Sequence, residues 1–180
     1  MAKVNLLHPE IVVLEYRQET TDKDYGSCLW AKFYFDTTNY KLLITSDCGE
    51  YGYGWCPDDE PFLKFMTGVR KDYLLEKISR KSIIDNKATF EEVKDYILEL
   101  TEGKPNVDYD EFELQNACSY NTLNEIYNAL TEIFDSMELD YDSEWLCSCI
   151  AEDYSYQARK IVDVFIDYIQ PEIKRIIKGE

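Results

Sequence analysis

Residues 29–46 read LWAKFYFDTTNYKLLITS, and this stretch decides the fold of the N-terminal part of the chain. Its first half alternates with a period of two, which is typical of a strand. One face of that strand carries Leu29, Ala31, Phe33 and Phe35. Asp36-Thr37-Thr38-Asn39 has turn chemistry, because Asp and Asn side chains bond to nearby backbone amides. Residues 40–46 form the return strand, so the pattern predicts a β-hairpin.

The segments on either side of this hairpin also indicate strands. Residues 10–17 are rich in β-branched side chains, and residues 49–55 alternate glycine with Tyr51, Tyr53 and Trp55. Bare glycine positions let another element approach the backbone closely. We expect the glycine side of this strand to lie under a helix, with an exposed aromatic ledge as the alternative. Residues 1–56 are therefore predicted to form a small antiparallel sheet of three to four strands.

From residue 57 onward the apolar period becomes helical, and the pattern predicts five to six helices. Two of them are expected to start at capping boxes, at Thr89 and at Thr122. The acidic block opens with a polar segment around Tyr109, Phe112 and Leu114, and Pro171 is expected to kink or divide the last helix. The fold class is α+β, with a sheet part at 1–56 and a helical part at 57–180. A chain of 180 residues is expected to form one compact domain, with two small lobes as the alternative.

The negative charge of the chain is concentrated in residues 105–158. This acidic segment contains 13 carboxylates and no Lys, Arg or His, so it accounts for −13 of the formal net charge of −17. It also contains enough apolar residues to fold, including a helix at 122–137 with apolar residues at i, i+3, i+4 and i+7. The layout predicts a folded, acidic binding surface.

A surface of this charge restricts the choice of partner. A pI near 4.4 argues against direct binding to DNA, RNA or anionic lipid, because phosphate contacts need Lys and Arg. It favours a basic partner such as a nucleic-acid-binding protein, whose groove attracts negative charge at long range. The alternative is a solvated face that only keeps the protein soluble. The predicted partner-binding residues are Asp108, Tyr109, Asp110, Glu111, Glu113, Asp135, Glu138, Asp140, Tyr141, Asp142 and Glu144.

Charge alone does not give a tight complex, because each exposed ion pair contributes only about 0.2–1 kcal/mol. Aromatic anchors would have to add to it. The candidates in the acidic segment are Tyr109, Phe112, Tyr141 and Trp145.

The sequence contains no strong signature of catalysis or of a bound metal. The six cysteines form no C-x-x-C pair, and the single histidine, His8, is far from them in sequence. Asp140-x-Asp142-x-Glu144 resembles the start of a calcium loop, but Trp145 stands where such a loop needs glycine. Phosphate-binding glycine loops and nucleophile elbows are absent. We therefore predict no catalytic residue, no metal site and no cofactor.

Targeting signals are also missing from the sequence. The chain opens without a signal-peptide pattern and has no apolar run of about 18 residues, the length needed to span a membrane. This predicts a cytoplasmic protein with no membrane partner and with reduced thiols.

One stretch of the chain resembles small phage and prophage proteins. It consists of Cys48-Gly49-Glu50-Tyr51-x-Tyr53-x-Trp55, followed by Phe62-Leu63-x-Phe65 and Tyr73-Leu74-Leu75-Glu76-Lys77. Small acidic phage proteins of this size are often inhibitors of host defence, and among these the chain looks most like the anti-CRISPR proteins. Several of those occupy the DNA-binding groove of a Cas nuclease by mimicking nucleic acid. The resemblance is one of type, and it assigns a role to no individual residue.

These observations lead to one favoured function and two alternatives. The favoured function is a non-enzymatic, phage-type inhibitor that binds a basic nucleic-acid-processing protein of the host, with a CRISPR-Cas effector as the favoured partner. Such a protein would act in the cytoplasm of the infected bacterium. The first alternative is a metal-dependent hydrolase or nuclease that uses clustered acids. The second is an interaction subunit that self-associates through Tyr51, Tyr53 and Trp55.

Overall fold

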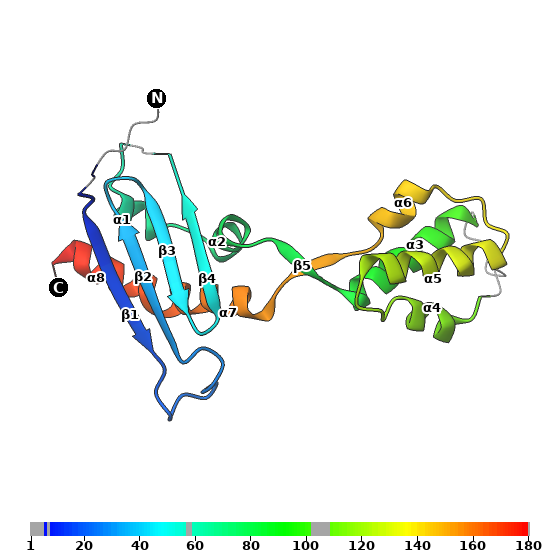
Figure 1. The fold of residues 1–180 in the computed structure, drawn as a ribbon, viewed down its shortest axis with the longest axis horizontal. Coiled ribbons are helices and arrows are strands. Elements are labelled where there is room, and N and C mark those ends of the chain that lie inside the picture. Colours follow the sequence, from blue (N-terminus) through cyan, green and yellow to red (C-terminus); the bar gives the residue numbers. More distant parts are fainter. Residues whose placement is uncertain (1–5, 7, 57–58, 102–108, 180) are drawn as a thin grey trace. The chain divides into compact units, whose positions relative to one another are not determined.

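The computed structural model describes residues 6, 8–56, 59–101 and 109–179. The chain folds into two compact units (Figure 1). Unit 1 contains residues 1–80 and 154–180, and unit 2 contains residues 81–153. Unit 2 is therefore inserted between two halves of unit 1, and each unit has a hydrophobic core of its own.

Unit 1 is built on a four-stranded antiparallel sheet in the order β1–β2–β3–β4. Its strands are β1 (Ile11–Arg17), β2 (Trp30–Asp36), β3 (Lys41–Ser46) and β4 (Gly49–Gly54). Phe33 pairs with Ile44 and Phe35 with Leu42, and all four side chains are buried. The predicted hairpin is confirmed, although Leu29 precedes β2 and is exposed instead of sharing the inner face.

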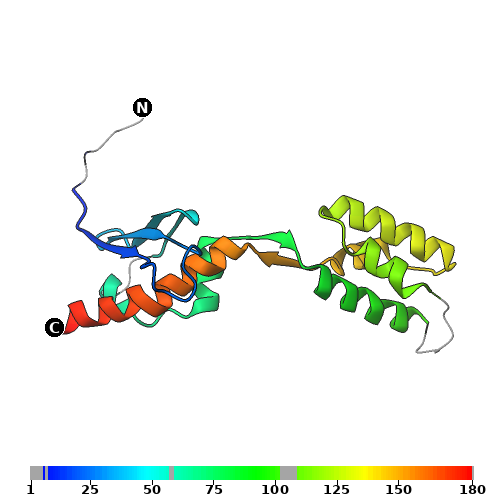
Figure 2. The same ribbon diagram turned by 90° about the horizontal axis from the view of Figure 1, so that it is seen from below.

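Helical segments from both halves of unit 1 cover one face of this sheet (Figure 2). They are α1 (Phe62–Met66), α2 (Lys71–Ile78), α7 (Tyr156–Val164), the π-helical turn η1 (Phe165–Ile169) and α8 (Gln170–Lys178). Ring centroids of Phe33 and Phe165 lie 6.0 Å apart, and those of Phe35 and Phe62 lie 6.4 Å apart. The residues after unit 2 therefore complete the core that the N-terminal sheet begins.

Strand β4 presents its aromatic side to the helices. Trp55, just after β4, packs against α1 and donates its Nε1–H to the Tyr73 hydroxyl at 3.0 Å. Gly52 lies beside Leu43 on the uncovered face, where an added Cβ would stand 2.8 Å from the Leu43 side chain. The expectation that a helix covers the glycine side is wrong, because the rings bury far more apolar area than glycine does. The aromatic ledge is exposed mainly at Tyr53, at 37%.

The C-terminal helix continues through Pro171. The π-helical turn η1 directly precedes α8, which has Pro171 in its first turn. Proline lacks a backbone N–H, and a locally widened turn accommodates the missing donor without a break. The buried Gln170 side chain donates to the carbonyls of Met66 and Val69, at 3.0 and 2.8 Å. The division expected at Pro171 is therefore a π-helical turn within one helical run.

Unit 2 consists of helices that stand between two short strands. They are β5 (Lys81–Ile84), α3 (Asn86–Leu100), α4 (Glu111–Ala117), α5 (Leu123–Ser136), α6 (Ser143–Ser148) and β6 (Glu152–Tyr154). Ile126, Leu130 and Phe134 on α5 are fully buried in the core of this unit. The capping box at Thr122 is confirmed, because its hydroxyl accepts the Glu125 N–H and donates to the Glu125 carboxylate.

The segment that enters unit 2 is hydrogen-bonded to the segment that leaves it. β5 and β6 form a two-stranded sheet. The Asp85 N–H donates to the Ala151 carbonyl at 2.9 Å, and the Ala151 N–H donates to the Thr89 hydroxyl at 3.0 Å. Thr89 is fully buried, and the Asp85 carboxylate accepts the Ala88 N–H to cap α3. These bonds close unit 2 where the chain enters and leaves it.

Several sequence-based expectations are confirmed or corrected by this fold. The α+β class and the N-terminal antiparallel sheet are confirmed. The prediction that a capping box at Thr89 starts a helix is wrong, because α3 begins earlier, with Asp85 as its N-cap. The segment described from the sequence only as polar contains α4, because Asp110 caps a helix that buries Leu114 and Ala117.

The compact units do not divide at residue 56. Some of the helices after that residue belong to unit 1 and the others to unit 2. The expectation of a single compact domain stays a prediction. None of the described helices has both the length and the apolar composition needed to cross a bilayer.

Replacing Thr89 by Val keeps the side-chain size but removes the acceptor for the Ala151 N–H. We expect the free energy of unfolding to fall by about 1–3 kcal/mol, because a backbone donor loses its partner beside a buried side chain. Urea denaturation followed by circular dichroism measures this change. Thr131→Val is the control, since the Thr131 hydroxyl bonds only to a carbonyl of its own helix. Equal losses in the two variants would contradict the assigned role of Thr89.

Candidate partner-binding site

The division into units separates the charge of the protein as well as its cores. Residues 81–153 contain 19 carboxylates and four lysines, so unit 2 has a formal charge of −15. Unit 1 contains 17 carboxylates and 15 Lys and Arg side chains, which leaves −2. Almost all of the net charge of −17 is therefore on one compact unit of 73 residues.

Several helix termini meet at one end of unit 2, the end away from β5 and β6 (Figures 1 and 2). They are the C-terminal ends of α3 and α5 and the N-terminal end of α4. We call this the acid-rich end. Its carboxylates, on these termini and on the loop that follows α5, are Glu99, Asp110, Glu111, Glu113, Asp135, Glu138 and Asp140, and all are exposed.

Some of the acids in unit 2 are explained by helix capping. The Asp110 carboxylate accepts the N–H groups of Phe112 and Glu113 at the start of α4. The Asp142 carboxylate likewise accepts the N–H groups of Glu144 and Trp145 at the start of α6, at 2.7 and 3.0 Å. Negative charge at a helix N-terminus is also favoured by the helix dipole. These acids stabilise the fold whether or not a partner binds.

Other acids lie where the fold disfavours them. Glu99 and Asp135 are in the last turns of α3 and α5, which contain no basic residue. An anion at a helix C-terminus opposes the helix dipole, at a cost of about 0.3–1 kcal/mol for an exposed group. Glu138 follows α5 with φ +52°, a left-handed conformation that favours glycine. Helix stability therefore gives no reason for acids at these three positions.

The backbone at Glu138 forms a helix-ending motif that normally uses glycine. The Leu139 N–H donates to the Phe134 carbonyl and the Glu138 N–H to the Asp135 carbonyl, at 3.1 and 3.0 Å. This is the Schellman pattern, in which the residue with positive φ is usually glycine. Glu138 therefore keeps an exposed carboxylate at a position where glycine would relieve strain.

A cluster of aromatic side chains holds the segment that follows α5. The Tyr141 ring packs edge-on against Phe134 at 5.2 Å, and its hydroxyl donates to the Asp135 carboxylate at 3.2 Å. The hydroxyl of the buried Tyr96 accepts the Asp142 N–H at 2.9 Å. The pKa of Tyr141 is raised by partial burial and by the nearby Asp135 carboxylate. This part of the acidic surface is therefore positioned by fixed contacts.

The aromatic anchors predicted from the sequence divide into two pairs. Tyr109 and Tyr141 are half-buried and pack against the core of unit 2. Phe112 and Trp145 are 71% and 55% exposed. Exposed rings among acids can bury apolar area against a partner, whereas the two tyrosines already use theirs within the unit.

Lysine neutralises little of this surface. Lys94 pairs with Glu111 at 3.0 Å, and this hydrogen bond raises the pKa of the Lys94 ammonium. Three other lysines belong to unit 2, at positions 81, 87 and 104, against 19 carboxylates. The surface therefore keeps a large excess of negative charge.

The structure places the predicted partner-binding residues in two groups. Asp110, Glu111 and Glu113 lie on α4. The others run from the end of α5 to the start of α6, and they are Asp135, Glu138, Asp140, Tyr141, Asp142 and Glu144. Tyr109 precedes α4, and Asp108 lies outside the described residues. The sequence analysis did not select Glu99. An acidic residue in the last turn of a predicted helix would have pointed to it.

Among the described residues, each cysteine with a shifted pKa has that pKa raised, so none of these thiols is an activated nucleophile. Burial raises the pKa of Cys28 and Cys48, and it raises the pKa of Cys118 and Cys149 to about 11 each. A nucleophilic cysteine needs a lowered pKa and a neighbouring base. In the part of the chain that the structure describes, no three carboxylates of unit 2 bring oxygens within 4.8 Å of one another. The acid-based hydrolase alternative gains no support from these residues.

The fold and the site define an α+β protein in which a nearly neutral sheet unit contains an inserted, strongly acidic helical unit. The family model Phage phiTE 072, described as a phage family, matches residues 12–175. The chain therefore belongs to this phage family, and the match spans both units. No curated protein and no solved structure matches the chain.

Replacing Glu138 by Gly tests whether the fold disfavours this acid. We expect the free energy of unfolding to rise by about 1 kcal/mol, because glycine adopts positive φ freely and the charge at the C-terminus of α5 is removed. Urea denaturation measures the change. The control is Glu132→Gly on the exposed side of α5, which is expected to lose about 1 kcal/mol, since glycine weakens a helix interior. A loss of stability in Glu138→Gly would refute the interpretation.

Proposed function

We propose that this phage-family protein is a non-enzymatic inhibitor that binds the basic nucleic-acid groove of a host defence protein through unit 2. A CRISPR-Cas effector is the favoured class of partner. The observation that carries the proposal is the separation of charge, −15 on unit 2 and −2 on unit 1. If acidity served only solubility, it would not have to be confined to one compact unit.

The physical basis of such an inhibitor is competition for a cationic groove. A groove lined with Lys and Arg binds nucleic acid partly by releasing the counterions that surround the phosphates. A folded surface with many carboxylates attracts the same groove at long range and speeds encounter. Unit 2 offers this charge on a hydrophobic core, so the carboxylates are displayed in a defined arrangement.

The energies require apolar anchors beside the acids. A dissociation constant of 1 μM corresponds to about −8.2 kcal/mol, and exposed ion pairs contribute about 0.2–1 kcal/mol each. Even at the top of this range, the seven carboxylates of the acid-rich end supply only about 7 kcal/mol, which falls short of that figure. Phe112 and Trp145, the exposed rings of α4 and α6, are therefore assigned as anchors.

The acids that oppose the fold support a binding role. Glu99, Asp135 and Glu138 lie at helix C-termini, and Glu138 also adopts positive φ. Local strain and unfavourable charge are common where function, not stability, selects a residue. A partner-binding role accounts for acids at these three positions. The proposed place of action is the cytoplasm of the infected host.

The decisive variant removes four acids of the acid-rich end that lie at or beyond a helix C-terminus: Glu99→Gln, Asp135→Asn, Glu138→Gln and Asp140→Asn together. The full-length tagged protein is used to capture partners from a nuclease-treated bacterial lysate, with and without added duplex DNA. We expect the wild type to retain basic nucleic-acid-binding proteins, and added DNA or salt to release them. The fourfold variant is expected to lose this capture and to be at least as stable as the wild type.

A matched control changes the same charge in unit 1. Glu10→Gln, Glu19→Gln, Glu50→Gln and Asp167→Asn alter four exposed acids of that unit. This control is expected to capture as the wild type does, which separates local charge from total charge. The proposal fails if the two fourfold variants behave alike, or if capture is unaffected by both DNA and salt.

A further inference from the structure

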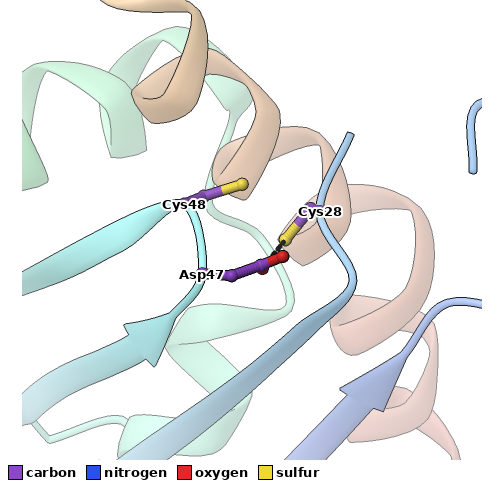
Figure 3. Close-up of side chains that lie close together, drawn as sticks. All are labelled: Cys28, Asp47 and Cys48. Atoms are coloured by element: carbon purple, nitrogen blue, oxygen red, sulfur yellow. Dashed lines mark hydrogen bonds between the residues drawn. The ribbon is translucent and has the colours of Figure 1, made fainter. Parts of the chain in front are cut away.

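We propose that Cys28, Asp47 and Cys48 of unit 1 form a zinc-binding site. The two sulfur atoms and a carboxylate oxygen lie within 4.8 Å of one another. Figure 3 shows the three side chains around one small space between the approach to β2 and the β3–β4 turn. Among the described residues, this is the one group of three or more such side chains that meets this distance.

The fold explains how residues that are distant in sequence meet here. Ala31 pairs with Ser46 in the β2–β3 hairpin, so the residues just beyond that pair become neighbours. Asp47 and Cys48 are adjacent, and adjacent side chains on a regular strand point to opposite faces. Asp47 and Cys48 form the turn between β3 and β4, so the opposite-face rule does not apply to them. Sequence spacing rules look for C-x-x-C pairs and miss this arrangement, which depends on the register of a hairpin.

The carboxylate is oriented by the backbone. The Leu29 N–H donates to Asp47 Oδ2 at 2.8 Å, and the Trp30 N–H donates to Asp47 Oδ1 at 3.3 Å. Cys28 Sγ lies 3.6 Å from the same Oδ1, as a donor. In metal sites, the carboxylates that bind the ion are typically oriented by hydrogen bonds from neighbouring groups. Asp47 is thus held with its oxygen beside the thiol before any ion binds.

The donor set and its burial favour zinc. Cys28 is fully buried and Cys48 is 6% exposed, whereas Asp47 is exposed. Two thiolates and one carboxylate are donors that Zn²⁺ accepts in tetrahedral geometry, with a fourth position left for water. Tetrahedral zinc holds two sulfurs about 3.8 Å apart, and the two Sγ atoms here lie within 4.8 Å of each other.

The surroundings also suit the charge of such a site. Two thiolates, a carboxylate and Zn²⁺ carry a net charge of −1. Burial raises the pKa of the Cys48 thiol, and the Lys160 ammonium, which pairs with Asp24, partly offsets that increase. The Ser27 carbonyl accepts the Cys48 thiol at 3.2 Å, a bond that a metal ion would replace, and the Tyr51 hydroxyl donates to the Cys48 carbonyl at 2.8 Å. A disulfide would make no use of the aligned carboxylate, which is why we assign an ion site and not a Cys28–Cys48 bond.

Metal titration of the reduced, full-length protein tests this site. Zn²⁺ is added in competition with a chromogenic chelator, and Co²⁺ is added separately to detect thiolate-to-cobalt charge transfer. We expect one equivalent of each ion to bind, with the absorption of thiolate-ligated tetrahedral cobalt. Cys28→Ala and Cys48→Ala are each expected to lose more than about 100-fold in zinc affinity, and Asp47→Asn about 10-fold or more. Cys56→Ser, which removes an exposed thiol of unit 1, is expected to bind as the wild type does.

A second measurement protects the test against variants that fold poorly. Zinc is expected to raise the thermal midpoint of the wild type and of Cys56→Ser, but not of Cys48→Ala, whose far-UV circular dichroism is compared in parallel. The proposal is overturned if the reduced wild type shows no thiolate–cobalt absorption, or if both alanine variants keep zinc affinity. It is also overturned if protein purified from a reducing cytoplasm has a mass that shows a Cys28–Cys48 disulfide.

Discussion

An inserted unit must bring the two ends of its own chain together, and the rest of this structure depends on how that is done. Here the pairing of β5 with β6 and the bonds between Asp85, Thr89 and Ala151 join the two ends. The entropy cost of bringing the ends of a segment together rises slowly with its length, by about 0.6 kcal/mol for each doubling of the number of residues. The helices between these strands bury a core of their own. Once its ends are closed, unit 2 can therefore carry a surface that its neighbour does not share.

That surface combines acids of two kinds. Asp110 and Asp142 occupy helix N-termini, where the fold itself needs an acceptor. Glu99, Asp135 and Glu138 occupy helix C-termini, where negative charge opposes the helix dipole, although Asp135 also accepts the Tyr141 hydroxyl. Both kinds contribute equally to the net charge. Only the acids at helix C-termini are left without an explanation in helix capping. Helix polarity thus separates structural acids from those that need another explanation.

The sequence predicted the elements whose pattern is local. Alternation over residues 29–46 defined the hairpin, and the capping box at Thr122 defined the start of α5. Local pattern failed at Thr89, because its hydroxyl serves a long-range bond to Ala151 and not a helix terminus. β5 and β6, four and three residues long, are too short to produce a periodic signal. The acidic segment was visible as charge, but its place within one inserted unit required the fold.

Because unit 1 is discontinuous, its assembly is tied to the order in which the ribosome releases the chain. The inner face of the sheet is covered by Phe165 and its neighbours in α7 and η1, which follow β4 by more than a hundred residues. α1 follows β4 closely and brings Phe62 to Phe35, but at about 5–20 residues per second Phe33 waits roughly 5–20 s for Phe165. Unit 2 is synthesised during this interval and is complete in sequence at residue 153, just before α7 begins. The acidic unit can therefore begin to fold while Phe33 still lacks its partner in η1.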